Sequence, residues 1–106
     1  MKRFESHELE AAIAHAADGG QALHVHRFVG NRHFAPRIFV REIDAGREIA
    51  HLFDRDIDRL IATARGLGVR AIKVGRQGTP KQHIDLCAAP LRAALAMAES
   101  EMLMHA

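Results

Sequence analysis

Residues 75–87 read GRQGTPKQHIDLC, and this stretch decides how many strands the fold contains. One interpretation is a helix, because Thr79-Pro80-Lys81-Gln82 fits a capping box with proline at the first helical position and glutamine at the third. The other is a strand, because HIDLC alternates polar and apolar residues. A strand places His83 and Asp85 on one face, whereas a helix sets them about 200° apart. Only the strand makes them a candidate catalytic pair.

The segments on either side of this stretch predict three helices. The first covers 6–17, with apolar residues at helical spacing and a stop at Asp18-Gly19-Gly20. The second covers 57–67, with Asp54 as the expected N-cap and Gly68 as the stop. The third covers 90–104 and is expected to begin with Pro90 at its first position.

Three further segments predict strands. ALHVHRF at 22–28 and RIFVREI at 37–43 alternate β-branched or aromatic residues with polar ones, and VRAIKVG at 69–75 is apolar enough for an interior strand. We therefore expect an α/β (α+β) fold in which three helices back one small sheet of three to four strands. The length of 106 residues predicts a single domain, 1–106.

The composition excludes several classes of protein. The 48% hydrophobic and 26% charged residues are ordinary for a globular domain and argue against disorder or a coiled coil. No apolar run approaches the roughly 18 residues that a membrane span needs, and the charged start MKRFESHELE lacks the apolar region of a signal peptide. These features, with Cys87 as the only cysteine, predict a cytoplasmic protein with no membrane partner.

The charges are segregated along the chain although the net charge is only +2. No acid occurs between Asp18 and Glu42 or between Asp58 and Asp85. This could create a positive face that binds a phosphate-bearing ligand or nucleic acid, or the acids and bases could neutralise each other as surface pairs. The candidate anion-binding residues are Arg27, Arg37, Arg76 and Lys81.

Eight histidines are the most unusual feature of the composition. His24 and His26 are spaced to share one face of a strand, and with His51 they are the candidate ligands of a divalent transition metal such as Zn²⁺, Mn²⁺ or Fe²⁺. If His83 and Asp85 converge on them, the ion could activate water to hydrolyse a phosphodiester. Without a metal, His83 could act as a general base held by Asp85. The alternative is a half-exposed strand whose histidines meet solvent.

Two features predict binding rather than chemistry. Phe28, Phe34 and Phe39 alternate with basic residues, a composition that suits stacking of unpaired bases or, alternatively, a core. The last helix carries more apolar residues than one stripe can hold, which favours a homodimer over a fraying terminus. These residues are Met97, Met102, Leu103 and Met104.

The segment 51–98 resembles a family of small uncharacterised bacterial domains. In that family a His-Leu followed by an acid precedes a helix ending in Leu-Gly, and a later His-aromatic-Asp-Leu precedes an alanine-rich last helix. The matching residues here are His51, Leu52, Asp54, Leu67, Gly68, His83, Asp85 and Leu86, whereas Ile84 departs from the aromatic. The resemblance implies no activity, but it favours an extended conformation for residues 83–86.

Overall fold

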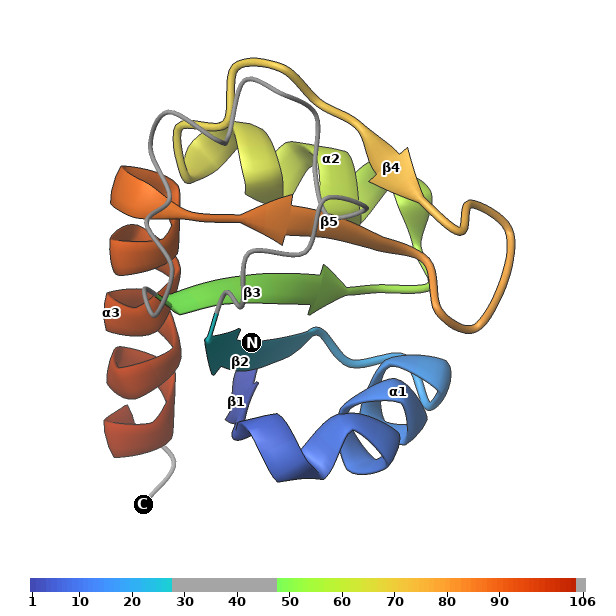
Figure 1. Ribbon diagram of the computed structural model, residues 1–106, viewed down its shortest axis with the longest axis horizontal. Coiled ribbons are helices and arrows are strands. Elements are labelled where there is room, and N and C mark those ends of the chain that lie inside the picture. Colours follow the sequence, from blue (N-terminus) through green and yellow to red (C-terminus); the bar gives the residue numbers. More distant parts are fainter. Residues whose placement is uncertain (28–47, 105–106) are drawn as a thin grey trace.

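The chain folds into one five-stranded mixed sheet with three α-helices, as a computed structural model shows for residues 1–27 and 48–104 (Figure 1). The strands are β1 (Lys2–Phe4), β2 (Ala22–Arg27), β3 (Glu48–Phe53), β4 (Val74–Gly75) and β5 (His83–Leu86). The helices are α1 (Leu9–Ala17), preceded by the 3₁₀ turn η1 (Ser6–Glu8), then α2 (Ile57–Gly66) and α3 (Ala88–Met104). The predicted α+β class is confirmed, with five strands where three to four were expected.

The strand order is β1-β2-β3-β5-β4, so β3 lies at the centre. β1 runs parallel to β2, and the other neighbours are antiparallel. Residues 83–86 form a strand, so the helical interpretation of this stretch is wrong. Thr79 lies in a turn instead, where its hydroxyl donates to the Arg76 carbonyl at 2.7 Å and accepts from the Lys81 amide at 3.2 Å.

One face of the sheet carries the larger core. Alternate residues of the three inner strands point to this face and pack against α2 and α3. The strand residues are Leu23, Val25, Ala50, Leu52, Ile84 and Leu86, and the helix residues are Leu60, Ala64, Leu91, Ala94 and Ala98. α3 runs across the strands from β5 towards β1 (Figure 1).

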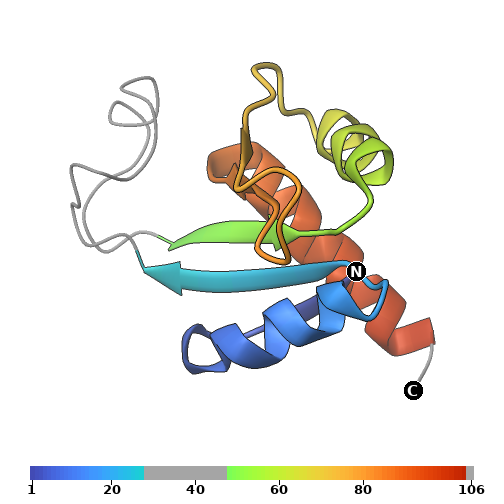
Figure 2. The ribbon, with the colours of Figure 1, turned by 90° about the vertical axis from the view of Figure 1, so that its right-hand side faces the viewer.

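The opposite face is covered only in part by α1. A smaller core forms where Ala12 and Ala16 of α1 meet Phe4, Ala22 and Phe53 of the sheet. Figure 2 shows α1 alongside β1 and β2. On this same face the next residues of β2, β3 and β5 are polar, so the alternation that builds one core also places a cluster of polar, mostly buried side chains beside the other.

The central strand β3 was not expected from the sequence, and neither was β1. EIAHLF alternates with the right period, but its only β-branched residue is Ile49, and it pairs with β2 and β5 over most of its length. The predicted strand at 37–43 lies outside the described residues. Pairing on both sides, rather than local preference, makes 48–53 a strand.

The expected interior strand at 69–75 is wrong in length and place. Only Val74 and Gly75 pair, and they form the edge of the sheet next to β5. Val69 and Ile72 pack against the larger core without pairing. Their apolar character therefore reflects burial over the core and not a position inside the sheet.

Two helix starts also differ from expectation. Asp56, not Asp54, caps α2 by accepting from the Arg59 amide at 3.1 Å. α3 begins at Ala88, so Pro90 is its third residue and not its first. Proline is tolerated there because the first-turn amides have no partner within a helix.

Asp54 is fully buried and forms an ion pair with Arg59. The guanidinium contacts both carboxylate oxygens at 2.7 Å, and Gln21 and the Asp56 amide each donate to the carboxylate at 2.9 Å. Burial raises the pKa of Asp54, but these hydrogen bonds outweigh it and hold the pKa below its ordinary value. The carboxylate thus ties the end of β3 to α2 and to the start of β2.

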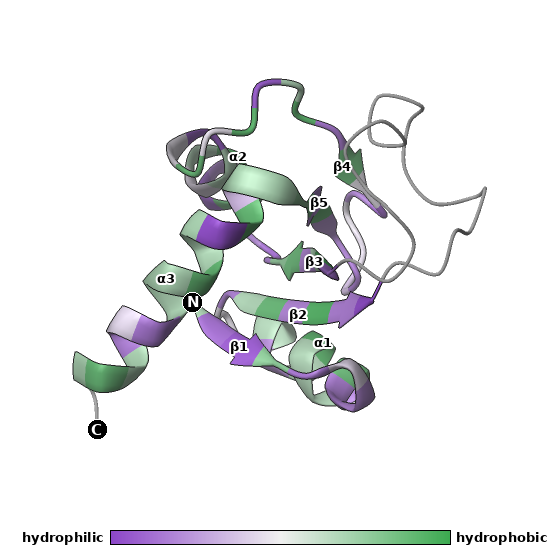
Figure 3. Cartoon of the chain, turned by 60° about the vertical axis from the view of Figure 1, so that its left-hand side comes forward, coloured by the Kyte–Doolittle hydropathy of each residue, from purple (hydrophilic) through white to green (hydrophobic). Residues whose placement is uncertain are grey.

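Within the described residues, none of the helices combines the length and the apolar character needed to cross a membrane. The hydropathy colouring shows polar residues along α3, between its apolar ones (Figure 3).

Candidate metal centre

Histidine and aspartate side chains from three strands meet on the sheet face that α1 leaves uncovered. His24 of β2, His51 of β3 and Asp85 of β5 are direct cross-strand neighbours. Because side chains alternate along a strand, His26 and His83, each two residues away, point to the same face. The register therefore brings together five ionisable side chains from three strands that are far apart in the sequence.

Three of these side chains are close enough to hold one ion. One ligand atom each of His51, His83 and Asp85 lies within 4.8 Å of the other two. His51 Nδ1 lies 2.6 Å from Asp85 Oδ1, and His83 Nε2 lies 3.5 Å from the same oxygen. Donors that share an ion at about 2.1 Å are roughly 3.0–3.5 Å apart. The His83 contact already has this spacing, and the shorter His51 contact needs only a small opening.

The two imidazole rings are also spaced as ligands of one ion would be. A ring centre lies about 3.2 Å from an ion bound at its nitrogen, so two such centres are roughly 4.5–5.2 Å apart. The centres of His51 and His83 are 4.8 Å apart, and the ring planes are inclined at 78°. Two histidines and one carboxylate form a ligand set that leaves coordination positions open.

A backbone contact sets the orientation of His83. Its Nδ1 lies 2.7 Å from the Lys81 carbonyl oxygen, to which only a protonated nitrogen can donate. In the neutral ring the lone pair is then on Nε2, the nitrogen that faces Asp85. A second hydrogen bond of this kind is typical of histidines that bind metals.

Gly75 makes room for the His83 ring. The two residues pair across β4 and β5, and a Cβ at Gly75 would lie 2.7 Å from His83 Cε1 and 2.8 Å from Nε2. Any side chain at this position would push the ring away. This role could not be predicted from the sequence, because a glycine at the end of a predicted strand is typical of an ordinary strand end.

His24 and His26 lie beside the group of three but not within it. His26 is on the far side of His51 from His83, since β2 and β5 flank β3. His24 donates its Nε2 proton to the Ser6 carbonyl at 3.0 Å. His24 Nδ1 and His26 Nε2 are the two buried side-chain polar atoms of the described residues without a hydrogen-bond partner.

The environment of His26 favours its neutral form. Burial lowers the pKa of His26, and the neighbouring His51 and His24 lower it further. Its ring centre is 4.9 Å from that of His51. A neutral imidazole can accept a hydrogen bond at its unprotonated nitrogen, and in His26 the unpaired Nε2 is buried.

The predicted anion-binding residues are only partly gathered at this site. Arg76 directly follows Gly75, and Lys81 offers its carbonyl to His83, so both cations lie in the β4–β5 loop beside the candidate ligands, where they are exposed. Arg27 ends β2 opposite Glu48. Arg37 lies outside the described residues.

The chain matches no protein-family model, no curated protein and no solved structure among those to which it was compared.

Proposed function

We propose that this domain binds one divalent transition-metal ion through His51, His83 and Asp85, and uses it to hydrolyse a phosphate ester. The convergence of these three ligands on one sheet face, with the His83 lone pair directed towards Asp85, is the observation that carries the proposal. Imidazole and carboxylate ligands suit Zn²⁺, Mn²⁺ and Fe²⁺.

Hydrolysis follows from the coordination positions that three protein ligands leave open. An ion held by His51, His83 and Asp85 would activate a bound water molecule as a nucleophile near neutral pH. The water oxygen would form a bond to phosphorus as the ester P–O bond breaks, and the departing alcohol would take up the proton that the water gives up. The rings of His24 and His26 lie on the β2 side of His51 and would border the site there, with their unpaired nitrogens buried.

Two cations support a phosphate-bearing substrate over a neutral one. Arg76 follows Gly75, the strand partner of His83, and Lys81 lies two residues before His83, in a loop that contains no acid. Their positive charge would attract a phosphate to the open side of the ion. Substitution of both by alanine should raise the KM for a phosphodiester and leave the affinity for the metal unchanged.

The first test is elemental analysis of tag-free protein purified without chelator. We expect close to one equivalent of a transition metal in the wild type, and a loss of metal in His83→Ala and Asp85→Asn. His7→Ala, an exposed histidine in η1, is the matched control and should keep its metal. Protein that binds no metal after dialysis against Zn²⁺, Mn²⁺ and Fe²⁺ would overturn the proposal.

A metal-free hydrolase is the second candidate, because His51 and Asp85 already form a hydrogen-bonded pair at 2.6 Å. Asp85 would then hold His51, rather than the expected His83, as a general base. The two candidates differ in their response to chelators. Hydrolysis that survives EDTA and is lost in His51→Gln would favour the metal-free pair.

A further inference from the structure

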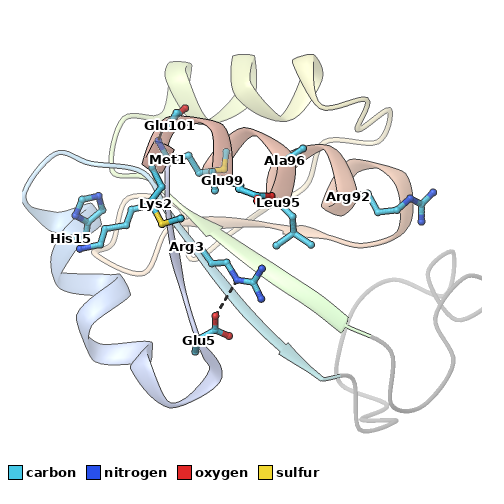
Figure 4. Close-up of a pocket in the computed structure, with 12 residues that line it drawn as sticks. Met1, Lys2, Arg3, Glu5, His15, Arg92, Leu95, Ala96, Glu99 and Glu101 are labelled. Carbon is cyan, nitrogen blue, oxygen red and sulfur yellow. Dashed lines mark hydrogen bonds and ion pairs between the residues drawn. The ribbon is translucent and has the colours of Figure 1, made fainter. Parts of the chain in front are cut away.

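A groove of about 1140 Å³ lies between β1 and α3, away from the histidine cluster (Figure 4). Apolar residues that line it include Met1, Leu95 and Met102. The last turn of α3 carries exposed apolar residues. Met102, Leu103 and Met104 keep 65%, 66% and 79% of their surface in contact with solvent. Of these exposed residues, Met102 lines the groove itself.

The groove side of α3 has a regular pattern. Arg92, Leu95, Ala96 and Glu99 line the groove, and together with Leu103 they recur at the i, i+3, i+4, i+7 and i+11 spacing that places residues on one helix face. The residues that α3 buries against the sheet are Leu91, Ala94 and Ala98, of which Ala98 also lines the groove, and Leu95 packs in part against the same core. Ala96 near the middle of the groove face is small enough to allow another helix to approach closely.

The charges on this face complement a copy of themselves. Arg92 and Glu99 are seven residues apart, are exposed, and form no ion pair with other described residues. If two α3 helices pack antiparallel about a two-fold axis near Leu95 and Ala96, each Arg92 meets Glu99 of the other chain. A partner of a single charge sign would meet one attractive and one repulsive charge instead.

We propose that this groove docks a second copy of the chain, with the two α3 helices antiparallel across a two-fold axis. Such an isologous interface is the commonest kind in soluble oligomers. It covers Leu103, an apolar residue on this face of α3 that the fold of one chain leaves exposed. The proposal is independent of the metal centre, because the groove contains none of its residues.

Analytical ultracentrifugation of the full chain tests the interface through exchanged charges. The variants Arg92→Glu and Glu99→Arg should each self-associate roughly tenfold or more weakly than the wild type, because like charges then face each other twice. An equimolar mixture of the two variants should recover the dimer, since both contacts become attractive. Leu9→Glu, at a 43% exposed position on α1, is the control and should leave the dimer unchanged.

Because Arg92 and Glu99 are exposed, the thermal stability of both variants should match the wild type apart from the contribution of the dimer. A wild-type chain that stays monomeric up to sub-millimolar concentration would overturn the proposal. So would a dimer that both variants leave intact, a mixture that fails to recover it, or growth into open-ended assemblies.

Discussion

At the scale of single residues, the candidate site depends on Gly75, which has no side chain. Alanine at Gly75 would place its Cβ within 2.7 Å of the His83 ring, so the ring must leave its position between the Lys81 carbonyl and Asp85. We expect Gly75→Ala to weaken metal binding about 10- to 100-fold, as the loss of an orienting contact typically does. Metal competition with a chromophoric chelator measures this.

Gly66→Ala is the matched control for this prediction. Gly66 ends α2, and a Cβ there meets nothing within 4 Å. The control should keep its metal affinity and lose no stability, because alanine is a better helix residue than glycine. Equal metal affinity in both variants would show that the position of the His83 ring does not matter for binding.

The buried carboxylate of Asp54 gives a second prediction at this scale. Arg59→Met removes its only cationic partner among the described residues and leaves a charge with no exposure to solvent. We expect the free energy of unfolding to fall by about 2–4 kcal/mol, less than for a fully buried pair because Arg59 is itself 42% exposed. Urea denaturation at neutral pH measures the change.

The double variant Asp54→Asn with Arg59→Met separates charge from packing. Without the carboxylate there is no uncompensated charge, so much of the lost stability should return. A double variant less stable than Arg59→Met alone would mean that the hydrogen bonds to Asp54, from Gln21 and from the Asp56 amide, matter more than the ion pair.

At the scale of secondary structure, α2 depends on one capping contact. The Asp56 carboxylate accepts from the Arg59 amide, one of the first-turn amides that the helix itself cannot satisfy. Asp56→Ala should lower the free energy of unfolding by about 1 kcal/mol. Thermal unfolding followed by circular dichroism measures this change. Asp58→Ala is the control: it lies in the first turn, leaves the Asp56 cap in place, and should lower the free energy of unfolding by less.

The elements differ in how far local sequence predicts them. α1 and α2 were expected at nearly their observed bounds, because helical spacing and stop signals lie within each segment. Gly19, with a φ of 101°, adopts the left-handed conformation that ends α1 where Asp18-Gly19-Gly20 predicted a stop. β1 has only three residues, and no period can be recognised over so short a length.

At the scale of the whole molecule, two histidines should make stability depend on pH. Burial lowers the pKa of His15 and of His26 below the ordinary value of 6.5. The unfolded chain therefore binds protons more readily than the folded one as pH falls below about 6.5. The stability that these neutral rings contribute is complete above that pH and is lost as pH falls towards their folded pKa values.

Urea denaturation at pH 7.5 and pH 5.5 tests this expectation. The free energy of unfolding should be lower at the acidic pH, and the difference should shrink in the double variant His15→Gln with His26→Gln. Equal stability at both pH values would contradict the assignment. Asp54 does not confuse the result, because its pKa lies below the ordinary 3.8 and it stays ionised at both pH values.

The sequence by itself determined the features that depend only on residues close together in the chain. These are the mixed class of the fold and the three helices, which follow from periods of 3.6 and 2. The period of 2 also places His24 and His26 on one face of their strand, and His83 and Asp85 on one face of theirs. Local periods left residues 83–86 open between helix and strand; the resemblance favoured the extended form, and these residues form a strand.

Only the tertiary structure decided which strands are neighbours. It placed β3 between β2 and β5, and this brought His51 next to Asp85 and made a candidate site from separate motifs. It also placed Gly75 against the His83 ring and left one face of α3 beside a groove. Sheet order and register arise from contacts between distant segments, which compete for the same core, and no local period encodes that competition.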